Sequence, residues 1–366
     1  MRIALAIVSY FAGGGLQRDC VQLARRLIAK GNEITIFTSR SDGTHPMDIR
    51  IETLPNRAVT NHGRNIRFGR DLRRAAGGRF HRIVGFDKLS GLDVLYCADH
   101  CHANPGPGAL ARLLPRNRAL SRLEEQCFGP NRSTRIIVLS ENQLQAYLDA
   151  WDTPRSRITL ISATLDKQRC RPTLRIDGTR DRLRSEMGIA PDNWLWLSIA
   201  SYPYTKGIDR TIRALSAHSN ACLLVVGIDS NSPRGRALRR QARRNGNLDR
   251  VRLIGYREDV PALMAAADLL VHPARLETTG SAILESIVNG LPAIVTATCG
   301  YAGHVNLAKA GIVLAEPFGE KQFHGALVEA GNCATTTRWS ENGRRYGAQH
   351  ELYRGLDEAA EIIMES

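Results

Sequence analysis

The chain has 366 residues, a length that favours two domains over one. Its 43 % hydrophobic and 23 % charged residues are typical of a soluble globular protein, and no segment approaches the ~18 apolar residues that a membrane-spanning helix needs. The apolar opening at Arg2–Val8 is too short for a secretion signal and predicts a buried first strand. We therefore expect a cytoplasmic protein.

The sequence is strongly basic, with 50 Lys and Arg against 36 Asp and Glu and a formal net charge of +14. This charge favours an anionic partner, which can be a nucleic acid, an anionic membrane or a phosphorylated substrate. A coding bias toward arginine explains part of the excess. A nucleic-acid-binding protein would interleave aromatic residues with its arginines, and the run Arg239–Arg244 has none. We therefore expect no nucleic-acid partner.

Strand-like and helix-like patterns alternate along the first half of the chain. Helices are predicted from Leu16 to the stop at Gly31, from the polar turn at Thr60–Asn65 to about Ala76, across the Arg-rich region Gly108–Phe128, and after Ser140, which has Gln143 in the capping-box position. The predicted strands are Arg2–Val8, Glu33–Phe37, Ile49–Leu54, Arg82–Gly85, Asp93–Cys97, Arg135–Leu139 and Arg157–Ile161.

After a polar, irregular linker at Thr164–Gly178 the alternation restarts, and the chain closes on a helical, polar-faced stretch at Trp339–Met364. Repeated β-α-β alternation predicts an α/β protein with parallel sheets covered by helices on both faces. We expect two Rossmann-like domains, residues 1–165 and 166–350, facing each other across a central cleft, with a helix at about 350–366 packed back on the first. The predicted strands of the second half are Trp194–Ile199, Cys222–Val226, Val251–Ile254, Leu269–Val271, Ala293–Thr296 and Ile312–Leu314.

The stretch His272–Asn289 combines the end of a strand, a short loop and a helix, and it carries two carboxylates, Glu277 and Glu285. If both lay along one helix axis, their spacing would separate them by roughly 12 Å. That span suits a ligand with two hydroxyl-bearing ends and a charged middle, such as a nucleotide sugar. The helix start after Gly280 offers amide groups to an anion. An ordinary strand–loop–helix unit with two unrelated acids fits the spacing equally well.

Two other loops follow predicted strands and suit phosphate groups. Lys206 follows the loop Ser201–Thr205 and can neutralise a diphosphate leaving group, or it is a solvated surface lysine. The glycine run Gly13–Gly15 after the first strand lets backbone amides approach a ligand. The run lacks the dinucleotide fingerprint, and a tight βα turn explains it as well.

Two aspartates stand where an acceptor hydroxyl can be held. Asp19 lies in the first turn of the first helix, where it binds an acceptor or simply complements the helix dipole. Asp99 follows the strand that ends at Cys97, and a carboxylate at the carboxyl end of a strand can orient or deprotonate a hydroxyl.

The sequence gives little support to a metal site. The densest group of metal-binding residue types is Cys97, His100, Cys101 and His102, but no second ligand pair follows at a zinc spacing. The eight cysteines are scattered, which is typical of reduced thiols. The sequence has no Asp-x-Asp motif that would hold a diphosphate through a metal. We expect neither a metal nor any other cofactor.

Residues 106–132 mix leucines with arginines in the manner of an interfacial amphipathic stretch. Pro107 and Pro115 break the segment, so it is not one long helix. An ordinary packed helix with a solvated basic face is the alternative. The residues concerned are Leu110, Leu113, Leu114, Leu120, Leu123, Arg112, Arg116, Arg118 and Arg122.

The pattern Glu277-x7-Glu285, with Lys206-Gly207 upstream and a glycine loop after the first strand, resembles the retaining family-4 glycosyltransferases of the GT-B fold. Further blocks resemble one subfamily, the lipopolysaccharide core glucosyltransferases that act on the inner-core heptose. The similarity runs from the first strand to the last helix. The blocks are Gly14–Asp19, Thr60–Asn65, Gly91–Val94, Ala98–Asp99, Met264–Asp268 and Cys299–Ala302.

The resemblance implies a UDP-sugar donor, classically UDP-glucose, retention at the anomeric carbon, and peripheral attachment to the cytoplasmic face of the inner membrane through 106–132. It places Glu277 at the donor-sugar hydroxyls, Lys206 at the diphosphate and Glu285 at the ribose, with Asp99 facing the acceptor or the reacting sugar. The other implied donor-binding residues are Gly14, Gly15, Thr278, Thr279, Gly280 and Ser281. The implied acceptor-binding residues are Asp19, Asn61, His62 and Arg64.

The sequence departs from the family pattern at three places, one of which is the turn Ile161–Thr164, where the Pro and Gly usual at the domain junction are missing. Thr205 stands where family members often have Arg, and Arg210 or another arginine would have to substitute for it. The loop Thr278–Gly280 is more polar than the usual Ala-Ala-Gly and can change the preferred sugar. Two alternatives stay open: transfer of another UDP-hexose or UDP-N-acetylhexosamine in cell-envelope glycan assembly, and a catalytically inactive membrane-bound scaffold.

Overall fold

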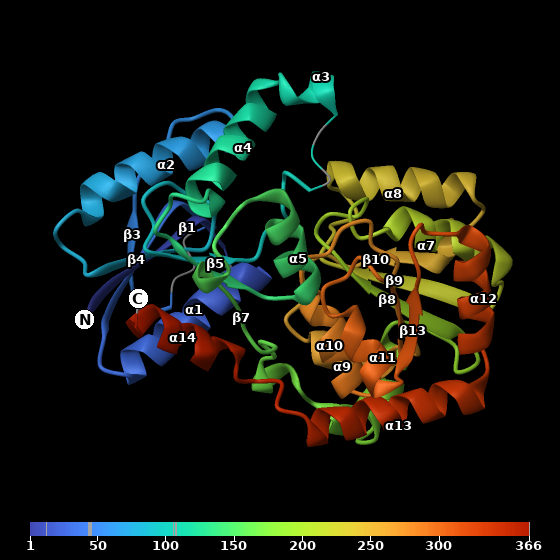
Figure 1. The fold of residues 1–366 in the computed structure, drawn as a ribbon. Coiled ribbons are helices and arrows are strands. Elements are labelled where there is room, and N and C mark those ends of the chain that lie inside the picture. The colour runs from blue at the N-terminus through green and yellow to red at the C-terminus, as the bar shows by residue number, and fades with distance from the viewer. Residues whose placement is uncertain (12, 43–45, 105, 107, 366) are drawn as a thin grey trace. The chain divides into compact units, whose positions relative to one another are not determined.

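In a computed structural model the chain forms two compact units, one made of Met1–Thr164 with Tyr353–Ser366 and the other of Leu165–Leu352. The structure describes residues 1–11, 13–42, 46–104, 106 and 108–365. Each unit contains a parallel β-sheet with helices on both faces (Figure 1). The predicted α/β class with two Rossmann-like domains is confirmed.

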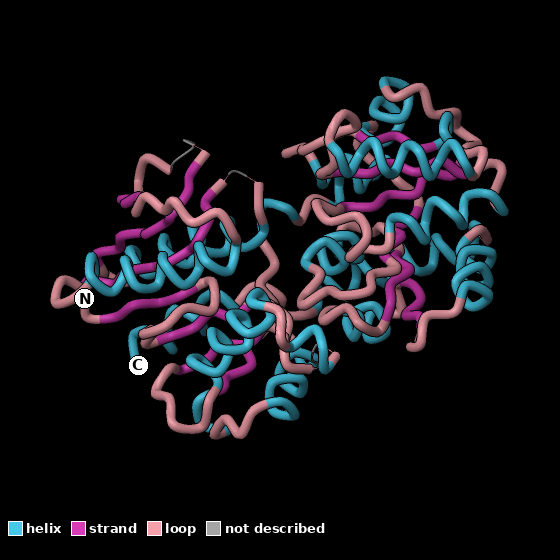
Figure 2. The backbone as a smooth tube through the Cα atoms, turned by 90° about the horizontal axis from the view of Figure 1, so that it is seen from above, coloured by secondary structure: helices cyan, strands magenta, loops and turns pink. Residues whose placement is uncertain are grey.

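The sheet of the first unit has seven strands in the order β3-β2-β1-β4-β5-β6-β7. Its central strands are almost entirely buried, as expected of a parallel sheet covered on both faces. Figure 2 shows the strands of each sheet side by side between helices. The strands are β1 Arg2–Tyr10, β2 Glu33–Ser41, β3 Arg50–Thr53, β4 Arg82–Gly85, β5 Val94–Cys97, β6 Arg135–Val138 and β7 Ile158–Leu160.

The helices of this unit bury apolar stripes against the sheet. On one face α1 and α14 pack together over the central strands, and on the other face α2, α4 and α5 contribute Phe68, Phe128 and Tyr147 to the core. Ser140 accepts a hydrogen bond from the Gln143 N–H, so the predicted helix start there is confirmed. The helices are α1 Gly15–Ala29, α2 Asn61–Ala76, α3 Ala109–Arg112, α4 Pro115–Phe128, α5 Glu141–Ala150 and α14 Gly355–Glu365.

The prediction that the C-terminal stretch is polar-faced is wrong for its last helix. The stretch is two helices, α13 (Cys333–Gln349) in the second unit and α14 in the first, separated by 350–354. α14 has an apolar face, with Leu356 and Ile363 buried against α1. Burying each of these side chains contributes about 2 kcal/mol.

The sheet of the second unit has the order β10-β9-β8-β11-β12-β13. Helices α7, α8 and α12 cover one face, and α9, α10 and α11 the other (Figure 1). The strands are β8 Trp194–Ile199, β9 Ala221–Val226, β10 Val251–Leu253, β11 Leu269–His272, β12 Ala293–Thr296 and β13 Gly311–Leu314. The other helices are α6 Thr179–Glu186, α7 Ile208–Ala214, α8 Pro233–Arg244, α9 Val260–Ala266, α10 Ser281–Val288, α11 Ala302–Ala308 and α12 Glu320–Ala330.

The predicted irregular linker is largely part of the second unit, because polar contacts hold it there. It contains two short 3-10 turns, Lys167–Arg169 and Pro172–Arg175. The Arg171 N–H donates to Asn289 Oδ1 at 2.5 Å, and Arg175 donates to the Met264 and Ala267 carbonyls at the end of α9. Among the described residues no helix is both long and apolar enough to span a bilayer.

Candidate active site

In each sheet there is one pair of neighbouring strands from which the chain adds its later strands in opposite directions, and we call this place the reversal point. In such sheets ligands bind at the reversal point, beyond the carboxyl ends of the strands. In the second unit the reversal lies between the neighbouring strands β8 and β11. The loops that follow these strands, 200–207 and 273–280, carry Lys206 and Glu277. The topology therefore brings together two residues that lie far apart in the sequence.

Lys206 and His272 both contact one oxygen of the Glu277 carboxylate. The Lys206 Nζ lies 2.6 Å from Glu277 Oε2, and the His272 Nε2 lies 3.0 Å from the same atom. The His272 ring is 2 % exposed, whereas the side chains of Glu277 and Lys206 are 13 % and 21 % exposed. The ring thus forms the floor of the cluster, and the lysine and the carboxylate reach the surface.

The cluster keeps Glu277 ionised. Burial alone would raise its pKa, but the hydrogen bond and charge of His272 and the charge of Lys206 lower the pKa of Glu277 to about 2. At neutral pH the carboxylate accepts hydrogen bonds and does not donate a proton. Such a group suits the hydroxyls of a sugar, and the adjacent ammonium suits a phosphate.

The loop between Glu277 and α10 is fixed through its backbone. The Gly300 N–H donates to the Glu277 carbonyl at 3.1 Å, and the Tyr301 N–H donates to the Thr279 carbonyl at 2.7 Å. Gly280 has φ 90°, and a Cβ there would lie 2.7 Å from Ile283 Cδ1, so only glycine fits. Thr278, Thr279 and Ser281 are partly exposed beside the first turn of α10, whose leading amides have no intrahelical acceptor.

Arg275 holds the two loops to each other. Its N–H donates to the Thr205 carbonyl at 2.8 Å, and its guanidinium binds the Asp209 carboxylate through both oxygens, at 2.7 and 2.8 Å. The guanidinium also lies 3.9 Å from the centre of the Tyr204 ring. The contact with the Thr205 carbonyl and a further one from Arg275 Nη1 to the Tyr204 carbonyl at 2.7 Å fix the loop that carries Lys206 against the loop that carries Glu277, and the bidentate pair ties the latter to the start of α7.

Arg210, one possible replacement for the basic residue that Thr205 displaces, already makes two contacts with the protein. Its guanidinium donates to the Pro273 carbonyl at 3.0 Å and stacks 3.7 Å from the centre of the Phe318 ring. Both contacts hold it against the protein.

Glu285 lies on α10, but Glu277 precedes that helix, so the two carboxylates do not share one helix axis and the spacing rule behind the expected 12 Å does not apply. The Glu285 side chain is 3 % exposed, and its Oε2 lies 2.8 Å from Arg169 Nε. This is an ion pair whose alignment falls short of a hydrogen bond at Nε. A role for Glu285 at a ribose stays a prediction.

In the first unit the strand order reverses between β1 and β4, next to the glycine run. Gly14 caps α1 and Gly15 begins it, and a Cβ on Gly15 would meet no atom within 4 Å. Ala12, which precedes the glycine run, lies outside the described residues. Donor binding by Gly14 and Gly15 stays a prediction, because the other donor-binding candidates belong to the second unit.

Three aspartates, Asp19, Asp87 and Asp99, lie near this edge of the first sheet. Asp19 Oδ2 accepts a hydrogen bond from the Tyr96 hydroxyl at 3.1 Å. Asp99 is exposed, and its carbonyl accepts from Gln143 Nε2 at 2.7 Å, which anchors its loop. Burial and the charge of Asp99 raise the pKa of Asp87 to about 7, against the opposing effect of the Val8 N–H.

The predicted acceptor-binding residues on α2 form their own small group. The Thr60 side chain caps the helix by accepting from the Gly63 N–H, and it lies 3.4 Å from His62 Nε2. Arg64 Nη1 donates to Asn61 Oδ1 at 3.3 Å. These polar side chains stand at the helix start, where they remain partly or fully exposed.

Sequence reasoning assigned no role to His272 or Asp87. Both lie at the carboxyl end of a strand next to a reversal point. His272 is the last residue of β11, and Asp87 comes two residues after the end of β4. That position is the signal that could have identified both. Among the described residues no group of His, Cys, Asp and Glu is arranged to hold a metal ion. The Cys97 and Cys101 thiols are buried, with Tyr147 and Glu124 as their respective hydrogen-bond partners.

Known protein families match both halves of the chain, and one relative matches almost its whole length. Residues 13–169 match the model of Glycosyltransferase Family 4, and residues 179–346 match that of Glycosyl transferases group 1. Lipopolysaccharide glucosyltransferase WaaG of Escherichia coli K12 is 34 % identical over 373 residues, with 99 % of this chain and 98 % of the relative covered.

Solved structures agree with this assignment. A crystal structure of WaaG superposes with a TM-score of 0.94 at 33 % identity, over 100 % of both chains. The Anabaena protein Alr3699/HepE, solved in complex with UDP and glucose, has a TM-score of 0.77 at 17 % identity, over 100 % of both chains, which shows a shared fold. The chain therefore belongs to the WaaG subfamily of the family 4 glycosyltransferases, which have the GT-B fold.

Proposed function

We propose that this enzyme transfers glucose from UDP-glucose to the heptose of the lipopolysaccharide inner core, with retention of anomeric configuration. The observation that carries the proposal is the Lys206–Glu277–His272 cluster at the reversal point of the second sheet. It stands in a chain that is 34 % identical over almost its whole length to a lipopolysaccharide glucosyltransferase.

In the proposed reaction the bond between the sugar C1 and the β-phosphate oxygen breaks, and a bond from C1 to the acceptor oxygen forms on the same face. The acceptor proton passes to the departing phosphate oxygen, so UDP is the leaving group. The Lys206 ammonium balances the charge that develops on the diphosphate. The Glu277 carboxylate accepts hydrogen bonds from the donor-sugar hydroxyls, beside Thr278, Thr279 and Ser281.

The remaining assignments complete the two substrate sites. Glu285 would bind the ribose, and Gly14 and Gly15 would approach the donor through their amides. Asp99 would orient the acceptor or the reacting sugar. The acceptor would be held by Asp19 and by the group on α2, which consists of Asn61, His62 and Arg64.

A donor panel tests the reaction. Purified enzyme is incubated with a heptose-terminated core acceptor and UDP-glucose, UDP-galactose, UDP-GlcNAc or UDP-GalNAc, and the product is read by mass spectrometry. We expect a gain of one hexose with UDP-glucose, and NMR of the product should show the α-anomer. Preference for an N-acetylhexosamine would reject the proposed donor, and absence of both transfer and UDP-sugar hydrolysis would favour the inactive-scaffold alternative.

The same enzyme would work at the cytoplasmic face of the inner membrane, held there by α3 and the start of α4. Leu110, Leu113 and Leu114 are 84 %, 71 % and 55 % exposed, and the exposed Arg112 and Arg116 lie next to them in the sequence. This combination suits an anionic lipid surface. Leu123, one of the leucines of the predicted amphipathic stretch, is buried in the core, and Pro107 lies outside the described residues.

A further inference from the structure

The second unit contains a cavity of about 450 Å³ at the end of its sheet opposite the candidate active site. Trp194 begins β8, Asp268 directly precedes β11, and Pro292 directly precedes β12, so the cavity lies at the amino ends of these strands. The six residues of β8 span roughly 20 Å. The cavity is therefore separate from the cluster of Lys206 and Glu277, which follows the carboxyl ends.

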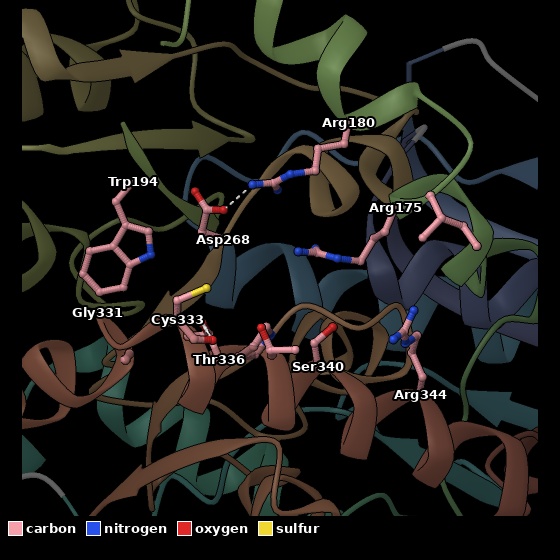
Figure 3. A pocket seen from close by; sticks show the side chains of 13 residues that line it. Arg175, Arg180, Trp194, Asp268, Gly331, Cys333, Thr336, Ser340 and Arg344 are labelled. Carbon is pink, nitrogen blue, oxygen red and sulfur yellow. Dashed lines mark hydrogen bonds and ion pairs between the residues drawn. The ribbon is translucent and has the colours of Figure 1, made fainter. Parts of the chain in front are cut away.

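The cavity carries more positive than negative charge. Arg175, Arg180 and Arg344 line it, against a single carboxylate from Asp268 (Figure 3). Asp268 is already paired with Arg180 at 2.5 Å and with Arg184, a neighbour outside the lining, at 3.1 Å. The cavity thus holds two guanidinium groups, those of Arg175 and Arg344, that have no carboxylate partner among the described residues.

Arg175 and Arg344 differ in what else holds them. Arg175 donates through Nη1 to two carbonyls at the end of α9, so part of its role is structural. Arg344 makes no hydrogen bond or ion pair within the described part of the chain, although its side chain is partly buried. Burial and the nearby charges of Arg180 and Arg344 lower the pKa of Arg175 to about 10, even though Asp268 opposes this effect. An anion between the two guanidiniums would relieve their repulsion.

The rest of the lining suits the neutral part of a small polar ligand. Thr336, Thr337 and Ser340 line one wall from α13. The Ser340 hydroxyl donates to the Gly290 carbonyl at 2.7 Å and the Thr336 hydroxyl to the Cys333 carbonyl at 3.1 Å, so these two oxygens can still accept a hydrogen bond from a ligand. Trp194 lies at the end of the cavity away from Arg344, as Figure 3 shows. An indole with neighbouring hydroxyls is a surface on which a sugar ring can lie. The volume is that of a site for a small molecule.

We propose that this cavity is a second binding site, which takes a sugar monophosphate with its phosphate between Arg175 and Arg344 and its sugar ring toward Trp194. A monoester phosphate offers several acceptor oxygens and up to two negative charges, which match two guanidiniums. The site would respond to the supply of phosphorylated sugar, the class of compound from which nucleotide sugars are made.

Isothermal titration calorimetry of the full chain tests the proposal with glucose 6-phosphate as the probe. Saturating UDP is present throughout, so that the nucleotide site is occupied. We expect one equivalent of probe to bind, and Arg344→Gln to weaken binding by at least about tenfold, as loss of a charge-assisted contact implies. Arg345→Gln is the matched control, because Arg345 is the exposed neighbour on the same helix and does not line the cavity. It should change affinity less than about twofold.

Arg344→Lys retains the charge and most of the side chain, so it should recover part of the affinity, and thermal melts confirm that each variant is folded. Glucose without phosphate should not bind, and inorganic phosphate should bind more weakly than the sugar phosphate. Equal loss in Arg344→Gln and Arg345→Gln, or no binding in the presence of UDP, would overturn the site. Equal affinity for inorganic phosphate and glucose 6-phosphate would overturn the assignment of the sugar.

Discussion

Lys206 and Glu277 join the two loops at the reversal point of the second sheet through a contact of 2.6 Å between Nζ and Oε2. Each group therefore has a partner before substrate arrives. In the proposed donor site this contact would align a cation for the phosphate beside an anion for the sugar hydroxyls, and both side chains are partly exposed.

Glu277→Gln keeps the size of the side chain and removes its charge. We expect kcat to fall at least ~100-fold, because a hydrogen-bond acceptor for the sugar and a partner that positions Lys206 are both lost. Steady-state kinetics with UDP-glucose measure the loss. Glu341→Gln, an exposed carboxylate on α13, serves as the control and should keep full activity. Near wild-type turnover in Glu277→Gln would remove this residue from the donor site.

Thr205→Arg adds the basic residue that this sequence lacks beside Lys206. The Thr205 backbone is held by Arg275, so the new side chain starts from a fixed position. We expect KM for UDP-glucose to drop by about 3- to 10-fold, the effect of one partly solvated charge-assisted contact. Thr205→Gln has similar reach without the charge and should leave KM unchanged. An equal effect of the two substitutions would show that charge is not the cause.

The acid sensitivity of stability should include a contribution from Glu277. Its pKa is about 2 in the folded protein, against 4.5 for a glutamate without partners. Because the folded pKa is depressed, the stabilisation is complete above about pH 4.5 and declines as the pH falls toward 2. Between pH 5.5 and 3.5 the wild type should lose about 1 kcal/mol more unfolding free energy than Glu277→Gln. Urea denaturation at the two pH values measures this difference, and identical losses would contradict it.

Membrane attachment should depend on the exposed leucines of α3 and its C-terminal neighbour. We expect Leu110→Ser with Leu113→Ser to reduce co-sedimentation with vesicles containing anionic phosphatidylglycerol by at least ~5-fold, because both apolar anchors are removed. Leu307→Ser is the control, since Leu307 is about as exposed as Leu113, at 72 %, but lies on α11. Binding that survives the double substitution would assign the membrane contact to another surface.

Turnover should persist after treatment with EDTA. In the proposed mechanism Lys206 carries out the neutralisation of the diphosphate that a metal ion performs in other nucleotide-sugar enzymes. Initial rates are compared before and after chelation and after readdition of Mg²⁺ or Mn²⁺. Loss of activity that only a divalent cation restores would refute this account.

Local patterns predicted the strands well where an apolar run stands between polar residues or glycines. The predicted bounds of β4, β8 and β12 match the observed ones. Strand β1 continues two residues past the predicted end, to Tyr10, because pairing with β2 extends it to the Tyr10–Ser41 pair. That extension depends on a neighbouring strand, which periodicity within one segment does not reveal.

The site was predictable only in part, for a similar reason. Glu277 and Lys206 stand in loops after strands, where position alone marks them. The sequence alone does not distinguish His272 from a core residue at the end of an apolar strand. Its contact with Glu277 is visible only in the three-dimensional structure. The pair of Asp209 and Arg275 spans 66 residues in a chain with many arginines, so the sequence offers no means of choosing the partner.

The packing of α14 on α1 has a consequence for synthesis of the protein. The core of the first unit includes Leu356 and Ile363, which leave the ribosome only after the whole second unit, because that unit is one continuous segment, Leu165–Leu352. Domains generally fold as units during translation, with the N-terminal one first. In this chain the order of completion is reversed: the second unit can finish folding while the first still lacks a helix and exposes the apolar surface of α1. Until α14 is synthesised, this apolar surface of the nascent N-terminal half is open to non-native contacts, which a chaperone would prevent.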